Sequence, residues 1–119
     1  DVLAFFELKL AFFTKHGLPE DHIILDPGIG FGKTTHDSCR LLKHLDVLKK
    51  LGRPLLVGIS NKSLFADLFG LTVHKRTEPT SVATALLAAQ GIVHHRVHSV
   101  ENARRALILA ELFTPWIKL

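Results

Sequence analysis

Apolar residues follow two patterns along this chain of 119 residues. In some segments they recur every three or four positions, which predicts amphipathic helices, and in others they form short runs, which predict buried strands. The predicted helices cover residues 2–16, 37–51, 62–69, 80–90 and 100–113. The predicted strands cover residues 23–26, 54–59 and 92–97, and residues 72–79 form a polar loop. Asp37 is expected to cap the second helix.

Strand and helix alternate with a regular period. Asp26, Ser60 and Arg96 end the three strands and lie about 35 residues apart. Such alternation is typical of parallel strands joined by right-handed helical crossovers. Eight units of this length would make roughly 280 residues, within the usual size range of a (β/α)8 barrel. The predicted fold class is therefore α/β, with a leading helix and three βα units that correspond to the last three-eighths of a barrel. An open Rossmann-like sheet would also place these residues on one edge.

Residues 26–33, Asp-Pro-Gly-Ile-Gly-Phe-Gly-Lys, directly follow the first strand. Glycines at alternate positions allow positive φ angles and a close approach of the backbone to a ligand. The loop is not a P-loop, because Pro27 stands where that motif needs its first glycine. It is not a GxGxxG fingerprint either, because Lys33 occupies the last glycine position. The loop predicts a binding site at the C-terminal edge of a parallel sheet.

Polar side chains gather at the ends of the predicted strands. Arg96 and His98 are two residues apart and therefore point to the same side. With Asp26, Ser60 and Lys62 they would share one rim, where a barrel builds its site. A carboxylate suits the adjacent N–H donors of an aminopyrimidine ring, and a guanidinium beside a histidine suits phosphate oxygens. Purely structural interpretations are also open: a turn cap for Asp26, a surface lysine for Lys62, and a strand-end ion pair with a neighbouring acid for Arg96 and His98.

Composition restricts the class of function. Hydrophobic residues make up 47% and charged residues 22%, which is typical of a soluble globular domain. The net charge is +4, but Lys and Arg are scattered, which argues against a nucleic-acid surface. No apolar stretch is long enough for a membrane span, and the first residues lack a signal-peptide pattern. The single cysteine, Cys39, suits a reducing compartment such as the cytoplasm, and the histidines lack zinc-ligand spacing.

Three sequence blocks, residues 25–33, 55–63 and 95–100, include the ends of the predicted strands. In content and order they resemble the pterin-binding, G-x-S-R-K-S and R-V-H-D-V segments of the dihydropteroate synthase family. The resemblance extends from about residue 18 onward. It implies that residues 1–119 are the C-terminal part of a single pterin-binding TIM-barrel domain, with strands 6–8. It also implies a transferase of folate biosynthesis that condenses 6-hydroxymethyl-7,8-dihydropterin diphosphate with para-aminobenzoate to give 7,8-dihydropteroate and pyrophosphate.

The resemblance also implies a role for each residue at the rim. It places the pterin against Asp26, Gly58, Lys62 and Arg96. It places para-aminobenzoate against Gly30, Phe31 and Ser60. It assigns the leaving diphosphate to Arg96 and His98, so that Lys62, Arg96 and His98 would carry the catalysis. Mg²⁺ would accompany the diphosphate, but the family's magnesium-binding asparagine has no counterpart here, and we expect no metal ligand in this chain. A homodimer through the late helices is implied as well, in keeping with the apolar residues of 100–113.

The sequence departs from the family pattern beside the site. Asn61 replaces the arginine before the lysine, Pro79-Thr80 replaces a Gly-Ser or Gly-Thr pair, and Ser99 replaces a frequent aspartate. The family's early strands have no counterpart, so we expect residues 1–119 alone to be inactive. Two other functions stay open. A methyltetrahydrofolate-binding methyltransferase shares the barrel but would not need the Arg96–His98 pair, and a non-catalytic barrel fragment would need a partner chain to cover its sheet edges.

Overall fold

A small parallel sheet organises the computed structural model, which describes residues 1–117. Strand β1 (Leu56–Val57) pairs in parallel with β2 (His94–His95), and Leu56 lies opposite His94. On the other side of β1, Leu25 forms a parallel bridge with Leu55. The predicted parallel arrangement of the three segments is therefore confirmed, with the middle segment of the sequence at the centre. The paired stretches, one bridge and two residue pairs, are shorter than the predicted strands.

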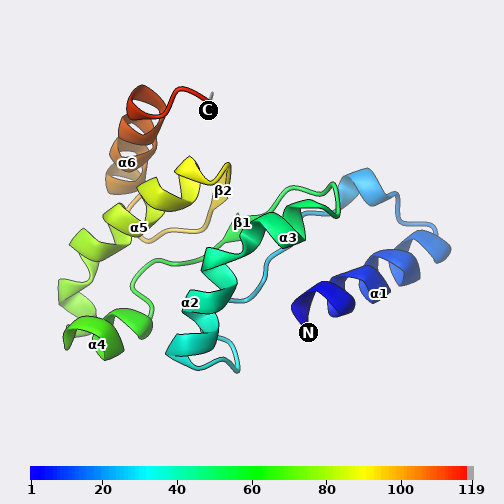
Figure 1. The fold of residues 1–119 in the computed structure, drawn as a ribbon, viewed down its shortest axis with the longest axis horizontal. Coiled ribbons are helices and arrows are strands. Elements are labelled where there is room, and N and C mark those ends of the chain that lie inside the picture. The colour runs from blue at the N-terminus through cyan, green and yellow to red at the C-terminus, as the bar shows by residue number, and fades with distance from the viewer. Residues whose placement is uncertain (118–119) are drawn as a thin grey trace.

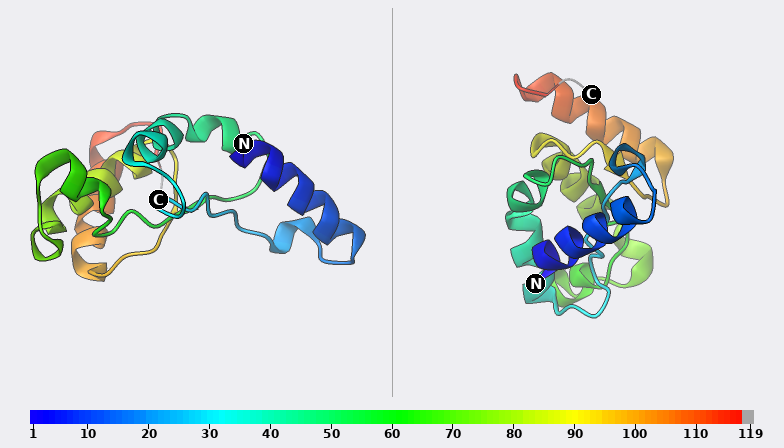
Figure 2. Two further views of the ribbon diagram at one scale, coloured as in Figure 1. Left: turned by 90° about the horizontal axis from the view of Figure 1, so that it is seen from below. Right: turned by 90° about the vertical axis from the view of Figure 1, so that its right-hand side faces the viewer.

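Helices connect and flank these strands (Figure 1). The α-helices are α1 (Val2–Lys15), α2 (Thr35–Lys43), α3 (Leu45–Lys49), α4 (Leu64–Phe69), α5 (Thr77–Ala89) and α6 (Val100–Phe113). Short 3-10 helices are η1 (Glu20–His22) and η2 (Val73–Lys75). Helices α5 and α6 pack against each other at one end of the molecule, and α1 lies at the other end (Figure 1). The result is an elongated molecule of 44 × 33 × 21 Å (Figure 2).

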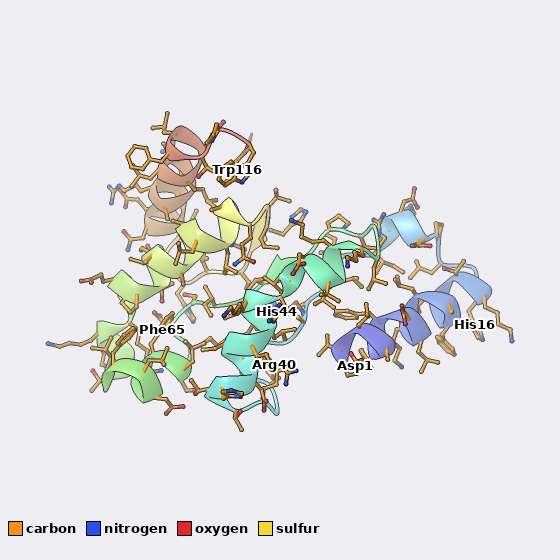
Figure 3. The ribbon with its side chains drawn as sticks, in the orientation of Figure 1. Asp1, His16, Arg40, His44, Phe65 and Trp116 are labelled. Carbon is orange, nitrogen blue, oxygen red and sulfur yellow. The ribbon has the colours of Figure 1, made fainter. Side chains whose placement is uncertain are left out.

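Two predicted helices differ from the observed ones. The helix predicted over residues 37–51 is divided at His44 into α2 and α3 (Figure 3). Its cap is Thr34 rather than Asp37: the Thr34 hydroxyl accepts from the Asp37 N–H, and the Asp37 carboxylate accepts from Thr34. This reciprocal capping box lowers the pKa of Asp37, chiefly through the hydrogen bond from the Thr34 hydroxyl. Helix α5 begins at Thr77, three residues before the predicted start, and so takes up the end of the predicted polar loop.

The core lies between the sheet and the helices that follow it. Its least exposed large side chains come from the glycine loop, α3, β1 with the residues just after it, and the turn before β2: Ile29, Leu45, Val57, Ile59 and Ile92. Helix α1 buries Phe6 and Leu10 but leaves other apolar residues exposed. After α6, Trp116 returns to the end of α5 and donates its indole N–H to the Ala89 carbonyl at 3.1 Å (Figure 3). Within residues 1–117, no helix is both long and apolar enough to cross a membrane.

Candidate functional site

The candidate site lies at the C-terminal end of the three parallel segments. Asp26 follows Leu25, Ser60 follows β1, and Arg96 and His98 follow β2. Parallel strands end on the same edge of their sheet, so these polar residues are brought together. Two pairs far apart in the sequence make direct contact there: Asp26 with Arg96, and Ser60 with His98. The shared rim predicted from the sequence is therefore present.

Asp26 and Arg96 form an ion pair across the edge of the sheet. The Arg96 Nη1 lies 2.7 Å from the Asp26 Oδ2, and the other carboxylate oxygen accepts from the Gly28 N–H at 2.9 Å. The pair is partly open to solvent, with 53% of the Arg96 side chain and 32% of the Asp26 side chain exposed. The strand-end ion pair that the sequence left open is thus present. A ligand that uses both carboxylate oxygens of Asp26 must displace the guanidinium.

The absence of a side chain at Gly58 leaves room for the Arg96 guanidinium. A Cβ atom added at Gly58 would lie 2.5 Å from the Arg96 Nη2 and 2.9 Å from its Cζ. Both distances are shorter than real Cβ contacts, so a side chain here would push the guanidinium away. The group that approaches Gly58 closely in this structure is Arg96, and the contact of Gly58 with the pterin stays a prediction.

His98 is held by the buried hydroxyl group of Ser60. The Ser60 Oγ lies 2.7 Å from the His98 Nδ1 and accepts from the His98 backbone N–H at 3.1 Å. Only 7% of Ser60 is exposed, whereas the His98 side of the pair faces outward. Side chain and backbone of His98 are therefore fixed by one hydroxyl group from the neighbouring strand.

The glycine loop folds around two lysine side chains. Gly28, Gly30 and Gly32 all have positive φ angles, as the sequence predicted, with values of 70°, 81° and 61°. Lys33 donates its ammonium group to the carbonyls of Gly28 at 3.0 Å and Phe31 at 3.2 Å, which closes the loop. The sequence predicts no role for Lys33, although it is the basic residue that ends the glycine loop.

Lys62 approaches the same loop from the end of β1. Its Nζ lies 4.5 Å from the centre of the Phe31 ring, within the range of a cation–π contact. A Cβ atom added at Gly30 would lie 3.5 Å from the Lys62 Cδ, so the loop backbone also borders this side chain. Phe31 is 66% exposed. Lys62, Gly30 and Phe31 are thus neighbours, and their assigned ligands stay predictions.

Two departures from the family pattern are in direct contact. Asn61 has a φ of 54°, a left-handed conformation that asparagine tolerates better than most residues. Its backbone N–H donates to the Thr80 hydroxyl at 3.0 Å, and its carbonyl accepts from Arg76 at 2.9 Å. Helix α5 and the residue before it therefore hold the turn that presents Ser60 and Lys62.

Two hollows open beside these residues. The outer one has a volume of about 330 Å³ and is lined by Gly58, Ser60, Asn61, Lys62, Arg96, Val97 and His98. A smaller polar hollow of about 150 Å³ lies behind His98, between the first turns of α5 and α6. The outer hollow is large enough for part of a small organic ligand, and two of its lining residues carry a permanent positive charge. Its chemistry suits a ligand with an anionic group.

The sequence is similar to those of several dihydropteroate synthases. A protein of Mycobacterium leprae named inactive dihydropteroate synthase 2 is 42% identical over 91 residues, which are 76% of this chain and 31% of that protein. The dihydropteroate synthase of Clostridium beijerinckii is 40% identical over 92 residues, which are 76% of this chain and 34% of that protein. The chain thus spans about a third of the length of these curated relatives.

The fold is also similar to that of solved dihydropteroate synthases. The crystal structure of dihydropteroate synthase from Anaplasma phagocytophilum with bound 6-hydroxymethylpterin-monophosphate superposes with a TM-score of 0.89 and 34% identity. The match covers 93% of this chain and 43% of that one, so the arrangement is that of an α/β dihydropteroate synthase fold. Residues 1–98 match the family described as pterin binding enzyme. Its sequence and fold are similar to those of part of a dihydropteroate synthase, and the chain belongs to the pterin binding enzyme family.

Proposed function

We propose that this chain is the C-terminal part of a dihydropteroate synthase barrel, with strands 6–8 and their helices. The observation that carries the proposal is the meeting of Asp26, Lys62, Arg96 and His98 at the ends of three parallel segments. The reaction needs two features: hydrogen-bond acceptors for the pterin ring, which the Asp26 carboxylate offers, and basic groups for the diphosphate, which Arg96 and His98 offer. The amine of para-aminobenzoate would displace pyrophosphate from the pterin diphosphate to give 7,8-dihydropteroate.

Because Asp26 and Arg96 are paired, the pterin would bind Asp26 first, and Arg96 would become free for the diphosphate only afterwards. Asp26 would accept from the N–H groups of the pterin, with Lys62 beside the ring. Arg96, displaced from Asp26, would then turn its planar fork to the diphosphate, with His98 donating to the same anion. Gly30, Phe31 and Ser60 are the proposed surroundings of para-aminobenzoate. Catalysis in this site would consist mainly of positioning and electrostatic stabilisation of the leaving group.

Mg²⁺ is the proposed companion of the diphosphate. Among residues 1–117, no cluster of three or more His, Cys, Asp or Glu side chains could hold a metal ion. The Asp26 carboxylate, which lies at the mouth of the site, is already paired with Arg96. These residues do not fit a resident magnesium site, and none of the steps above depends on the ion.

A homodimer through helix α6 is part of the proposal. Small residues of α6, Ala103, Ala106 and Ala110, are buried, whereas Leu112 and Phe113 are 71% and 80% exposed. Apolar side chains of this size exposed together favour a subunit contact. Sedimentation of the full-length protein at micromolar concentration should show a dimer, and a monomer alone would contradict this part. The single cysteine supports a cytoplasmic location.

The test of the proposed function is turnover of both substrates. Full-length protein would be incubated with pterin diphosphate, para-aminobenzoate and Mg²⁺, and pyrophosphate release followed. We expect turnover of about 1 per second or faster that requires both substrates, and none from residues 1–119 alone.

A non-catalytic pterin-binding protein is the second candidate, because the Mycobacterium leprae relative carries the word inactive in its name. Full-length protein that binds the pterin diphosphate but releases no pyrophosphate would favour this candidate. The methyltransferase alternative is less well supported, since it gives the Arg96–His98 pair no task.

A further inference from the structure

The hydroxyl group of Ser60 makes two contacts, and both are with His98. Its Oγ is 3.1 Å from the His98 backbone nitrogen and 2.7 Å from the ring Nδ1. Ser60 is 7% exposed and lies at the end of β1, while His98 follows β2. The side chain of one strand end thus determines the geometry of a residue 38 positions later in the sequence.

The positions of the protons follow from what each group can donate. A backbone N–H is only a donor, so the Ser60 Oγ accepts from it and keeps its own hydroxyl proton free to donate. Within residues 1–117, both hydrogen-bond partners of that hydroxyl group are groups of His98: the backbone N–H and the ring Nδ1. The arrangement that uses the hydroxyl group both as an acceptor from the backbone N–H and as a donor has its proton directed to Nδ1. A neutral imidazole that accepts at Nδ1 carries its own proton on Nε2.

We propose that Ser60 is a positioning residue that holds neutral His98 in the Nε2–H tautomer. Nε2 is the ring nitrogen that Ser60 does not contact, and His98 lines the hollow together with Arg96, so the Nε2–H is the donor that the ring can offer to a ligand there. An anionic oxygen there receives a hydrogen bond without protonation of the ring. The opposite tautomer would present a lone pair to the anion and repel it. The identity of the anion as the substrate's diphosphate rests on the proposed function.

Ser60 therefore acts on the anion through His98. This role differs from the contact with para-aminobenzoate that the family resemblance implies for the same residue. The two roles give different results in a Ser60→Ala variant. Loss of tautomer control changes the ¹⁵N signals of His98 in the absence of any ligand, whereas loss of a substrate contact leaves them unchanged.

The experiment is ¹⁵N NMR of histidine-labelled full-length protein, at a pH where His98 is neutral, with His98→Gln used to identify the signal. Wild-type protein should show the proton on Nε2. Ser60→Ala should move the signals toward a mixture of tautomers, and Ser81→Ala, which changes a hydroxyl group on the smaller hollow, should leave them unchanged. A proton on Nδ1 in wild type, or identical signals in wild type and Ser60→Ala, would overturn the proposal. The wild-type result decides the matter even if Ser60→Ala does not fold.

The affinity for inorganic pyrophosphate with Mg²⁺ tests whether the His98 Nε2–H donates to a bound anion. Ser60→Ala should weaken pyrophosphate binding by up to about 10- to 100-fold, the usual range for one hydrogen bond to a charged group, and Ser60→Thr, which keeps the hydroxyl group, should restore much of the affinity. Unchanged pyrophosphate affinity in a Ser60→Ala protein whose tautomer has changed would overturn the link to the anion. Wild-type protein with the expected tautomer but no pyrophosphate binding would instead contradict the proposed function and leave the Ser60–His98 assignment supported.

Discussion

Replacing Gly58 with alanine should disable the anion site while leaving the fold intact. The new Cβ would lie 2.5 Å from the Arg96 Nη2, whereas an ordinary contact is 3.4–4 Å. The guanidinium must therefore move by roughly 1 Å, which is enough to break its 2.7 Å contact with Asp26. A misplacement of this size in a catalytic group can reduce activity by about 100-fold. We expect pyrophosphate and pterin diphosphate to bind about 10- to 100-fold more weakly, because the displaced guanidinium would no longer make its charge-assisted hydrogen bond to the anion.

Stability should change little in the same variant. Gly58 does not have a positive φ, so alanine fits its backbone and gains about 0.4–1 kcal/mol from the lower entropy of the unfolded chain. The lost ion pair with Asp26 is partly exposed and contributes about 0–1 kcal/mol. The two effects nearly cancel, and the free energy of unfolding should stay within about 1 kcal/mol of wild type.

A double-mutant cycle with Arg96→Ala decides whether the effect of Gly58→Ala passes through Arg96. Calorimetric titration with pyrophosphate gives the affinities, and urea denaturation gives the stabilities. In the Arg96→Ala background, Gly58→Ala should change the affinity by less than about two-fold, because no guanidinium is left to displace. Independent, multiplicative losses in the two variants would refute the reasoning. A large loss of stability in Gly58→Ala alone would refute it as well.

Three further predictions address other residues. Arg96→Lys keeps the charge but loses the planar guanidinium, so titration and kinetics should show a loss of about 1–3 kcal/mol in the binding free energy of the pterin diphosphate and in transition-state stabilisation. The control Arg105→Lys, in an exposed ion pair, should leave both unchanged. Lys62→Ala should weaken binding of the pterin with or without its diphosphate, and equal weakening of pyrophosphate alone would contradict this. Burial lowers the pKa of His95 below its ordinary value of 6.5, so the unfolded chain takes up a proton below that pH that the folded chain excludes. The free energy of unfolding should therefore fall as the pH drops below about 6.5, and His95→Gln should flatten this part of the profile in urea titrations; an unchanged slope would argue against it.

Elements with strong local signals could be predicted from the sequence. The parallel segments, most helices and the positive φ angles of the glycine loop follow from apolar runs, helical spacing and glycine positions. Thr34 as the cap of α2 was missed although its signal was present, since Thr34 and Asp37 have the spacing of a capping box. The division of that helix at His44 had no such signal, because the apolar spacing continues across it.

Contacts between strand ends could be predicted only as a shared rim. The pairing of Arg96 with Asp26 depends on the register of the three segments and on the space above Gly58. Neither can be inferred from the residues near Arg96 in the sequence. The same holds for Ser60 and His98, which meet only because β1 and β2 are neighbours. Sequence patterns named the residues of the site, and the tertiary structure determined how they pair.

The most direct test of the central claim compares two ligands of the full-length protein: 6-hydroxymethyl-7,8-dihydropterin diphosphate and the same pterin without the diphosphate. Both would be titrated by calorimetry in Mg²⁺ buffer into wild type and into an Arg96→Ala/His98→Ala variant. The account predicts that wild type binds the diphosphate form at least about ten-fold more tightly than the form without it, as expected for one charge-assisted hydrogen bond. The variant should bind both forms with equal affinity. Equal affinity of wild type for the two ligands would contradict the anion site and, with it, the assignment of this chain to the synthase reaction.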